Sequence, residues 1–163
     1  MNLSYNSLAV LAATFALQAA PCQNYGVSMS VTSSGGEQVG YMSEQFDCTP
    51  SSLIVDVGSA LWVEMYGLAD SAYILFAGAP SANCYTLPWV LGGISMEPPF
   101  MILEVGLVPA AGYLSKCGMD TAATKLPIGS NAPYGAQIVL QTAAWSSNYD
   151  LPGFSRGVML TVK

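Results

Sequence analysis

Acidic side chains are the only abundant groups of this chain that are charged at neutral pH, since it has ten Asp and Glu, four Lys and Arg, and no histidine. Asp56 and Glu64 fall on neighbouring predicted strands, on faces turned away from the predicted core. A glycosidase needs two carboxylates about 5–9 Å apart across a cleft. Acids on an outer face also serve simply to keep a sheet soluble. We favour this second interpretation and predict no catalytic residue, so a hydrolase built on this pair is the least favoured hypothesis.

The absence of histidine removes several other kinds of chemistry. Histidine metal ligands, histidine general bases and the usual Ser or Cys triads are all excluded. The chain has no Gly-x-Ser-x-Gly motif, no phosphate loop and no dinucleotide fingerprint. Four cations cannot form the basic face of a nucleic-acid-binding protein. We therefore predict a protein that is not an enzyme, with no cofactor, no metal ion and no nucleic-acid partner.

The four cysteines, Cys22, Cys48, Cys84 and Cys117, are the remaining reactive groups. None has the Cys-x-x-Cys spacing of zinc or redox sites, and four cysteines allow three disulfide pairings. We predict a bond between Cys84 and Cys117, because both flank predicted strands and the chain begins like an exported one. Sequential pairing would add a bond between Cys22 and Cys48. The alternative is buried free thiols in a cytosolic protein.

Residues 1–22 resemble a secretory signal. An apolar stretch of thirteen residues, 8–20, precedes Pro21. This length fits the apolar centre of a signal peptide and falls short of the roughly 20 residues that span a bilayer. The features against a signal are the absence of Lys or Arg before the stretch and a poor cleavage site. We expect a secreted or cell-surface protein without a transmembrane helix, and the alternative is an assembly segment that stays attached.

After residue 30, apolar and polar side chains alternate with the period of two that is typical of strands, and Gly and Pro turns separate short runs. Residues 72–77 form a continuous apolar run, which suits a strand buried on both faces. We predict that residues 23–163 form one antiparallel β-sandwich, jelly-roll or immunoglobulin-like, of about eight short strands. Turns are expected at residues 78–80 and at 98–99. The predicted core contains Ile74, Leu75, Leu103, Val105, Ile138, Leu140, Val158 and Leu160.

Trp62 and Tyr66 lie two residues either side of Glu64 and should project from the same face of one strand. Two aromatic rings on one face can stack against the pyranose rings of a carbohydrate. These residues are therefore a candidate ligand platform. The competing interpretation is that they only cover the sandwich.

The last third of the chain carries a resemblance to a known group of modules. It has Lys-Leu-Pro-Ile-Gly at residues 125–129, Tyr-Gly-Ala-Gln-Ile at 134–138 and a closing strand, Gly-Val-Met-Leu-Thr-Val, at 157–162. These runs resemble the C-terminal β-sandwich modules of secreted planctomycete proteins, and the similarity extends over about residues 37–163. The resemblance implies export and a β-sandwich fold, and it provides no catalytic residue.

Composition points to contacts between copies of the chain. Charged residues are only 9% of the sequence, and the mean hydropathy is +0.44. The few cations lie in the last third, so strand edges in the first two thirds have no basic side chain to repel another edge. We expect a noncatalytic exported structural subunit of the cell surface or of an extracellular assembly, a filament included. The alternative is a carbohydrate- or ligand-binding module.

Overall fold

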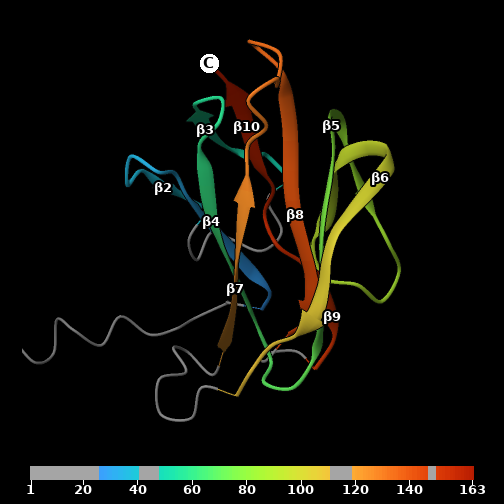
Figure 1. Ribbon diagram of the computed structural model, residues 1–163. Coiled ribbons are helices and arrows are strands. Elements are labelled where there is room, and N and C mark those ends of the chain that lie inside the picture. Colours follow the sequence, from blue (N-terminus) through green and yellow to red (C-terminus); the bar gives the residue numbers. More distant parts are fainter. Residues whose placement is uncertain (1–25, 41–47, 111–118, 147–149) are drawn as a thin grey trace, which may run out of the picture.

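The computed structural model describes residues 26–40, 48–110, 119–146 and 150–163, and these form ten strands and no α-helix (Figure 1). None of the described residues belongs to a helix that could cross a bilayer. The strands are β1 (Ser28–Thr32), β2 (Gln38–Val39), β3 (Ser51–Val55), β4 (Ala60–Gly67), β5 (Ala72–Thr86), β6 (Gly93–Leu107), β7 (Asp120–Pro127), β8 (Gln137–Trp145), β9 (Pro152–Phe154) and β10 (Val158–Val162).

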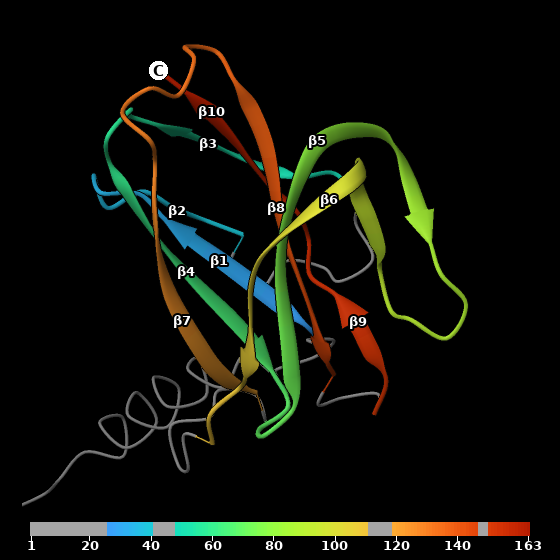
Figure 2. The ribbon, with the colours of Figure 1, turned by 45° about the vertical axis from the view of Figure 1, so that its right-hand side comes forward.

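The strands make two packed sheets, which confirms the predicted all-β sandwich (Figure 2). The first sheet has the order β2-β1-β4-β7. The second has the order β3-β10-β8-β5-β6, and β9 pairs with β8. Neighbouring strands run antiparallel except β3 and β10, which are parallel. Residues 1–22, with the signal-like segment, lie outside the described residues.

The core between the two sheets follows the alternation of the sequence. On β4, Leu61, Val63 and Met65 are fully buried, while Trp62 between them is exposed. β3 and β10 alternate in the same way across their parallel pair, so Leu53 and Leu160 face the core together. The period of two therefore specifies which face of each of these strands is buried.

The prediction of eight core side chains is confirmed for four of them, Leu75, Leu140, Val158 and Leu160, which are buried. Leu103 and Ile138 are half-buried and pack at the margin of the core. Ile74 and Val105 were expected inside and are exposed, so the prediction is wrong for both. They lie directly opposite each other on the outer face of the second sheet. A continuous apolar run cannot tell which of two faces is covered.

The turns expected at residues 78–80 and 98–99 are wrong, because both lie within long strands. β5 and β6 have 15 residues each and form one hairpin with three register shifts. β6 is the edge of the second sheet, where prolines cost no ladder hydrogen bond on the open side. The irregular register bends the distal part of the hairpin, residues 79–96, over the outer face of the second sheet (Figure 2). We call this part the arm.

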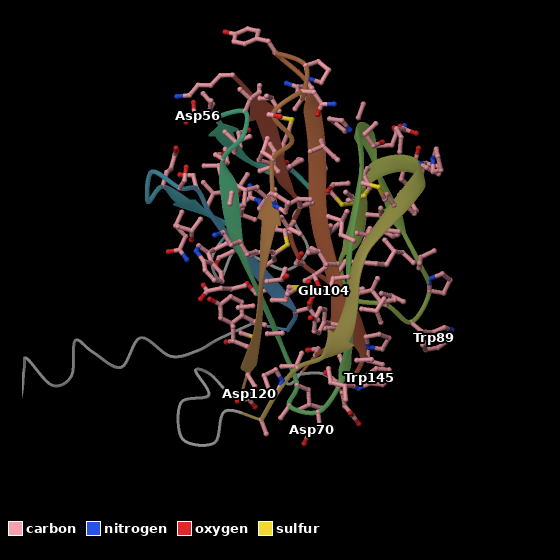
Figure 3. The ribbon with its side chains drawn as sticks, in the orientation of Figure 1. Asp56, Asp70, Trp89, Glu104, Asp120 and Trp145 are labelled. Carbon is pink, nitrogen blue, oxygen red and sulfur yellow. A yellow bond between two sulfur atoms is a disulfide. The ribbon has the colours of Figure 1, made fainter. Side chains whose placement is uncertain are left out.

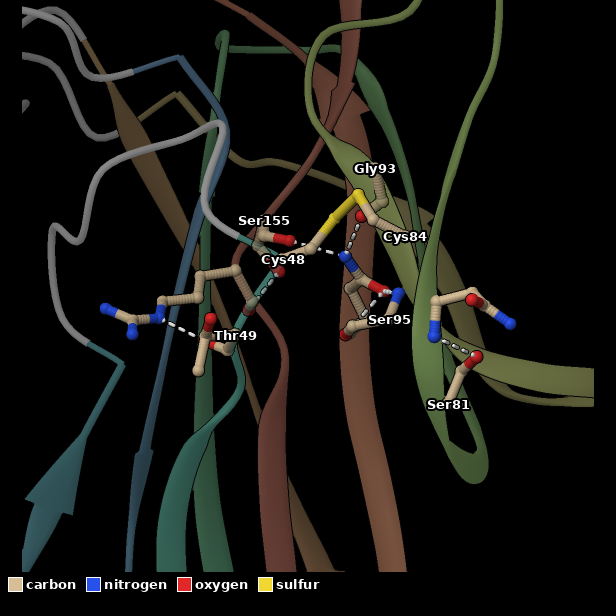
Figure 4. The surroundings of a disulfide bond; sticks show 10 residues. Cys48, Thr49, Ser81, Cys84, Gly93, Ser95 and Ser155 are labelled. Atoms are coloured by element: carbon tan, nitrogen blue, oxygen red, sulfur yellow. Dashed lines mark hydrogen bonds between the residues drawn. A yellow bond between two sulfur atoms is a disulfide. The ribbon is translucent and has the colours of Figure 1, made fainter.

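A second, smaller core lies between the arm and the sheet that it covers. It consists of Phe76, Ile94, Met96, Val139 and Phe154. Gln141 on β8 is fully buried beside it, and its side-chain amide donates to the carbonyls of Gly93 and Ser155, at 2.7 and 2.6 Å. The same amide accepts from the backbone N–H of Ser95 at 3.2 Å (Figure 4). One polar side chain on β8 thus bonds both to the arm and to the residue that follows β9.

A disulfide joins Cys48, which precedes β3, to Cys84 in the arm, with Cα atoms 5.7 Å apart (Figure 4). The predicted bond between Cys84 and Cys117, and with it the sequential pairing, is therefore wrong. The reason is the bending of the hairpin, which carries Cys84 back across the sheet toward the start of β3. Cys22 and Cys117 lie outside the described residues.

Candidate functional site

The acidic pair considered for hydrolysis is not brought together. Asp56 follows β3 of the second sheet and lies 3.8 Å from the Lys163 ammonium (Figure 3). Glu64 lies on β4 of the first sheet, where its carboxylate accepts hydrogen bonds from the hydroxyls of Ser30 and Tyr66. In the part of the chain that the structure describes, no three His, Cys, Asp or Glu side chains are grouped to hold a metal ion.

The candidate ligand platform is reduced to a single ring. Trp62 is 53% exposed, but Tyr66 is only 6% exposed and its hydroxyl donates to Glu64 at 2.9 Å. A buried ring has no free face for a sugar, so the prediction of a two-ring platform is wrong. Trp62 lies opposite Lys125 of β7, whose ammonium is 5.9 Å from the centre of the indole ring. This is the geometry of a cation–π pair.

An unusual surface lies along residues 100–107 of β6, which we call the octet. Phe100, Ile102, Val105 and Leu107 are between 41% and 66% exposed, and Met101 is 55% exposed. β6 is an edge strand, and within the described ranges it pairs with β5 alone. Edge strands normally carry charges or other features that discourage pairing. The octet instead has the apolar composition of a strand from the interior of a sheet.

A β-bulge decides which side chains of the octet share a face. Ile102 pairs with Phe76 and Val105 with Ile74, so the strand contains one extra residue between these two pairs. Phe76 and Ile74 are two residues apart on β5 and lie on the outer face. Ile102 and Val105 are therefore both outward, although three residues separate them. Simple alternation, which groups Met101, Leu103, Val105 and Leu107, could not reveal this arrangement.

Two apolar hollows lie on either side of the octet. The outer hollow, of about 440 Å³, is lined only by apolar residues: Ile74, Phe76, Ile94, Phe100, Ile102, Ala143 and Phe154. The inner hollow, of about 270 Å³, opens between the two sheets, with Met101, Leu103 and Leu126 among its lining residues. Exposed, contiguous apolar surface of this kind marks interaction sites in soluble proteins.

Glu104 is the one charged residue of the octet, and Tyr73 holds it on the inner face (Figure 3). The Tyr73 hydroxyl donates to the Glu104 carboxylate at 2.5 Å. The Tyr73 ring lies across Gly106, where any Cβ would come within 2.8 Å of it, so a larger residue there would have to displace the ring. Burial, followed by the hydrogen bond and the negative charge of Glu104, raises the pKa of Tyr73 from 10.0 to about 12.

We predict that Tyr73 makes the fold sensitive to alkali. The pKa is higher in the folded than in the unfolded chain, so the stabilisation is complete below pH 10.0 and is lost as the pH rises toward about 12. Urea unfolding across this range should give a free energy of unfolding that falls less steeply in Tyr73→Phe than in the wild type. Tyr134→Phe, at an exposed tyrosine, is the control and should keep the wild-type slope. Equal slopes in all three proteins would contradict the prediction.

Comparison with known proteins adds no functional assignment. No protein-family model matches the chain, and no curated protein has significant sequence similarity to it.

Proposed function

We propose that the protein is a noncatalytic, exported structural subunit that associates with further copies of itself at the cell surface or in an extracellular assembly, a filament included. The observation that carries this proposal is the apolar octet at the open edge of the second sheet, with an apolar hollow on each side. The disulfide between Cys48 and Cys84 supports export, because such bonds persist in oxidising compartments.

The charge distribution supports a contact between identical chains. Two copies, each with a net charge of −6, repel each other over most of their surfaces. Contact through the outer hollow places no like charges against each other at that surface, because every residue that lines the hollow is apolar. Burying exposed side chains such as Ile102 and Leu107 would also supply the hydrophobic free energy of association.

We predict concentration-dependent self-association that depends on the octet. Light scattering should give a mass above that of the monomer at about 100 μM, and the mass should rise with salt, which screens the repulsion between acidic copies. Val105→Lys should raise the dissociation constant about tenfold or more, since it puts a charge into the apolar face. Ile54→Lys, at a similarly exposed position on the edge strand β3, is the matched control and should leave association unchanged. A wild-type protein that stays monomeric in physiological salt would contradict the proposal.

A carbohydrate-binding module is the second candidate function. The observation in its favour is Trp62, whose ring is half exposed on the outer face of the first sheet beside the Lys125 ammonium. An indole ring next to a cation suits a pyranose that carries an anionic group. The buried Tyr66 weakens this candidate, and a strictly monomeric wild-type protein would raise it to first place.

A further inference from the structure

We infer that the octet is a strand-addition site whose occupant is the octet of a second copy, paired antiparallel about a twofold axis. This inference rests on the proposed self-association and specifies one contact, which by itself closes at two copies, so a larger assembly would need a further contact. Residues 100–107 have apolar side chains on both faces of the sheet but a paired strand only on the side of β5. Their composition is that of a central strand, which has a neighbour on each side. The open side of the octet is therefore suited to pair with an added strand.

The symmetry of the octet identifies the partner. Because of the bulge, Phe100, Ile102, Val105 and Leu107 all point outward, and they are spaced evenly about the point between Leu103 and Glu104. Two octets that run antiparallel about this point bring Ile102 of one copy opposite Val105 of the other. The same arrangement brings Phe100 opposite Leu107, so outward apolar residues meet outward apolar residues throughout. A closed twofold pair satisfies both open edges at once.

The neighbouring residues limit the pairing to the octet. Pro98 and Pro99 precede it on β6, and proline has no N–H to donate to an added strand. After Leu107 the strand ends. No Lys or Arg lies within the octet to repel another edge, and its only charge, Glu104, already accepts a hydrogen bond from Tyr73. In this register Glu104 of each copy lies opposite Leu103 of the other, so the two carboxylates are diagonal neighbours across the axis, and their repulsion limits the affinity.

Hydrogen exchange distinguishes strand pairing from contact between side chains alone. Amides of residues 100–107 that do not bond to β5 exchange freely in a monomer, and a paired strand protects them. Exchange measured by mass spectrometry at low and high protein concentration should therefore slow in the octet as the dimer forms. Peptides from β7, an edge strand of the first sheet, serve as the internal control and should exchange at the same rate at both concentrations.

Two charge variants test the position of the twofold axis. Glu104→Gln keeps an acceptor for Tyr73 and removes a negative charge from each side of the axis, so it should lower the dissociation constant about two- to fivefold. Glu37→Gln makes the same change in net charge at an exposed position between β1 and β2, outside the octet. It should have little effect on the dissociation constant. Equal effects of the two variants would overturn the placement of Glu104 at the axis.

The outcomes separate this inference from the proposal on which it rests. A monomer at every concentration contradicts self-association itself. A dimer that Val105→Lys dissociates, but that gives the octet amides no protection, leaves self-association intact and overturns the strand pairing. Protection of the octet together with a mass limited to two copies is the result that the inference expects.

Discussion

Replacing Cys48 and Cys84 together by serine should lower the free energy of unfolding by about 4 kcal/mol. The bond links residues 36 positions apart, and a loop of this length restricts the unfolded chain by roughly that amount. Urea unfolding of the wild type and of the double variant, without reductant, measures the difference. Asn83→Ser, at an exposed neighbour in the arm, is the control and should change the free energy by less than about 0.5 kcal/mol.

The position of the bond also predicts where the variant loosens first. The disulfide fixes the arm to the segment before β3, and the arm covers the second core around Phe76, Met96 and Phe154. In the double variant, amides of the arm should exchange faster than they do in the wild type. Amides of β4, which belongs to the first sheet, should change less. A loss of stability below about 1 kcal/mol, with unchanged exchange in the arm, would contradict this account.

Much of the first core could be predicted from the sequence, because one face of each strand is polar. On β4 the buried residues Leu61, Val63 and Met65 alternate with more polar or exposed ones, and the register follows directly. β10 also alternates, with Val158 and Leu160 inside, although Met159 on its other face packs against the second core. Where one face meets water and the other meets the core, the period of two specifies the fold.

The hairpin of β5 and β6 could not be predicted, because its features depend on tertiary contacts. Gly78, Pro80 and the two prolines of β6 are turn residues in most contexts, yet here they lie in long, irregular strands. The disulfide partner of Cys84 depends on how far this hairpin bends. The candidate site depends on it as well, since the bulge between Ile102 and Val105 is invisible to a strict alternation.

For the candidate ligand platform, the sequence predicts the face of Tyr66 but not its burial. Its position two residues after Glu64 correctly predicts a shared face, and the hydrogen bond between the two side chains agrees with it. Alternation gives the direction of a side chain but not what covers it, so Trp62 on the same face is exposed and Tyr66 is not. A single sequence contains no local signal for that difference.

Gln141 is the polar counterpart of the disulfide in holding the arm. Its amide donates to the carbonyls of Gly93 and Ser155 and accepts from the N–H of Ser95, all in a fully buried site. A buried carbonyl or N–H that loses its partner costs about 1–3 kcal/mol. Leucine has nearly the same size as glutamine but can neither donate nor accept a hydrogen bond.

Gln141→Leu should therefore lower the free energy of unfolding by about 4 kcal/mol, because three backbone groups lose their partner together. Gln141→Glu should cost still more at neutral pH, since a buried carboxylate cannot donate to the two carbonyls and repels them. Gln137→Leu, at an exposed position on the same strand, is the matched control and should change stability by less than about 0.5 kcal/mol. Urea unfolding of the three variants measures these differences. If the Leu variants at the two positions were equally stable, the arm would be held by apolar packing and the disulfide alone.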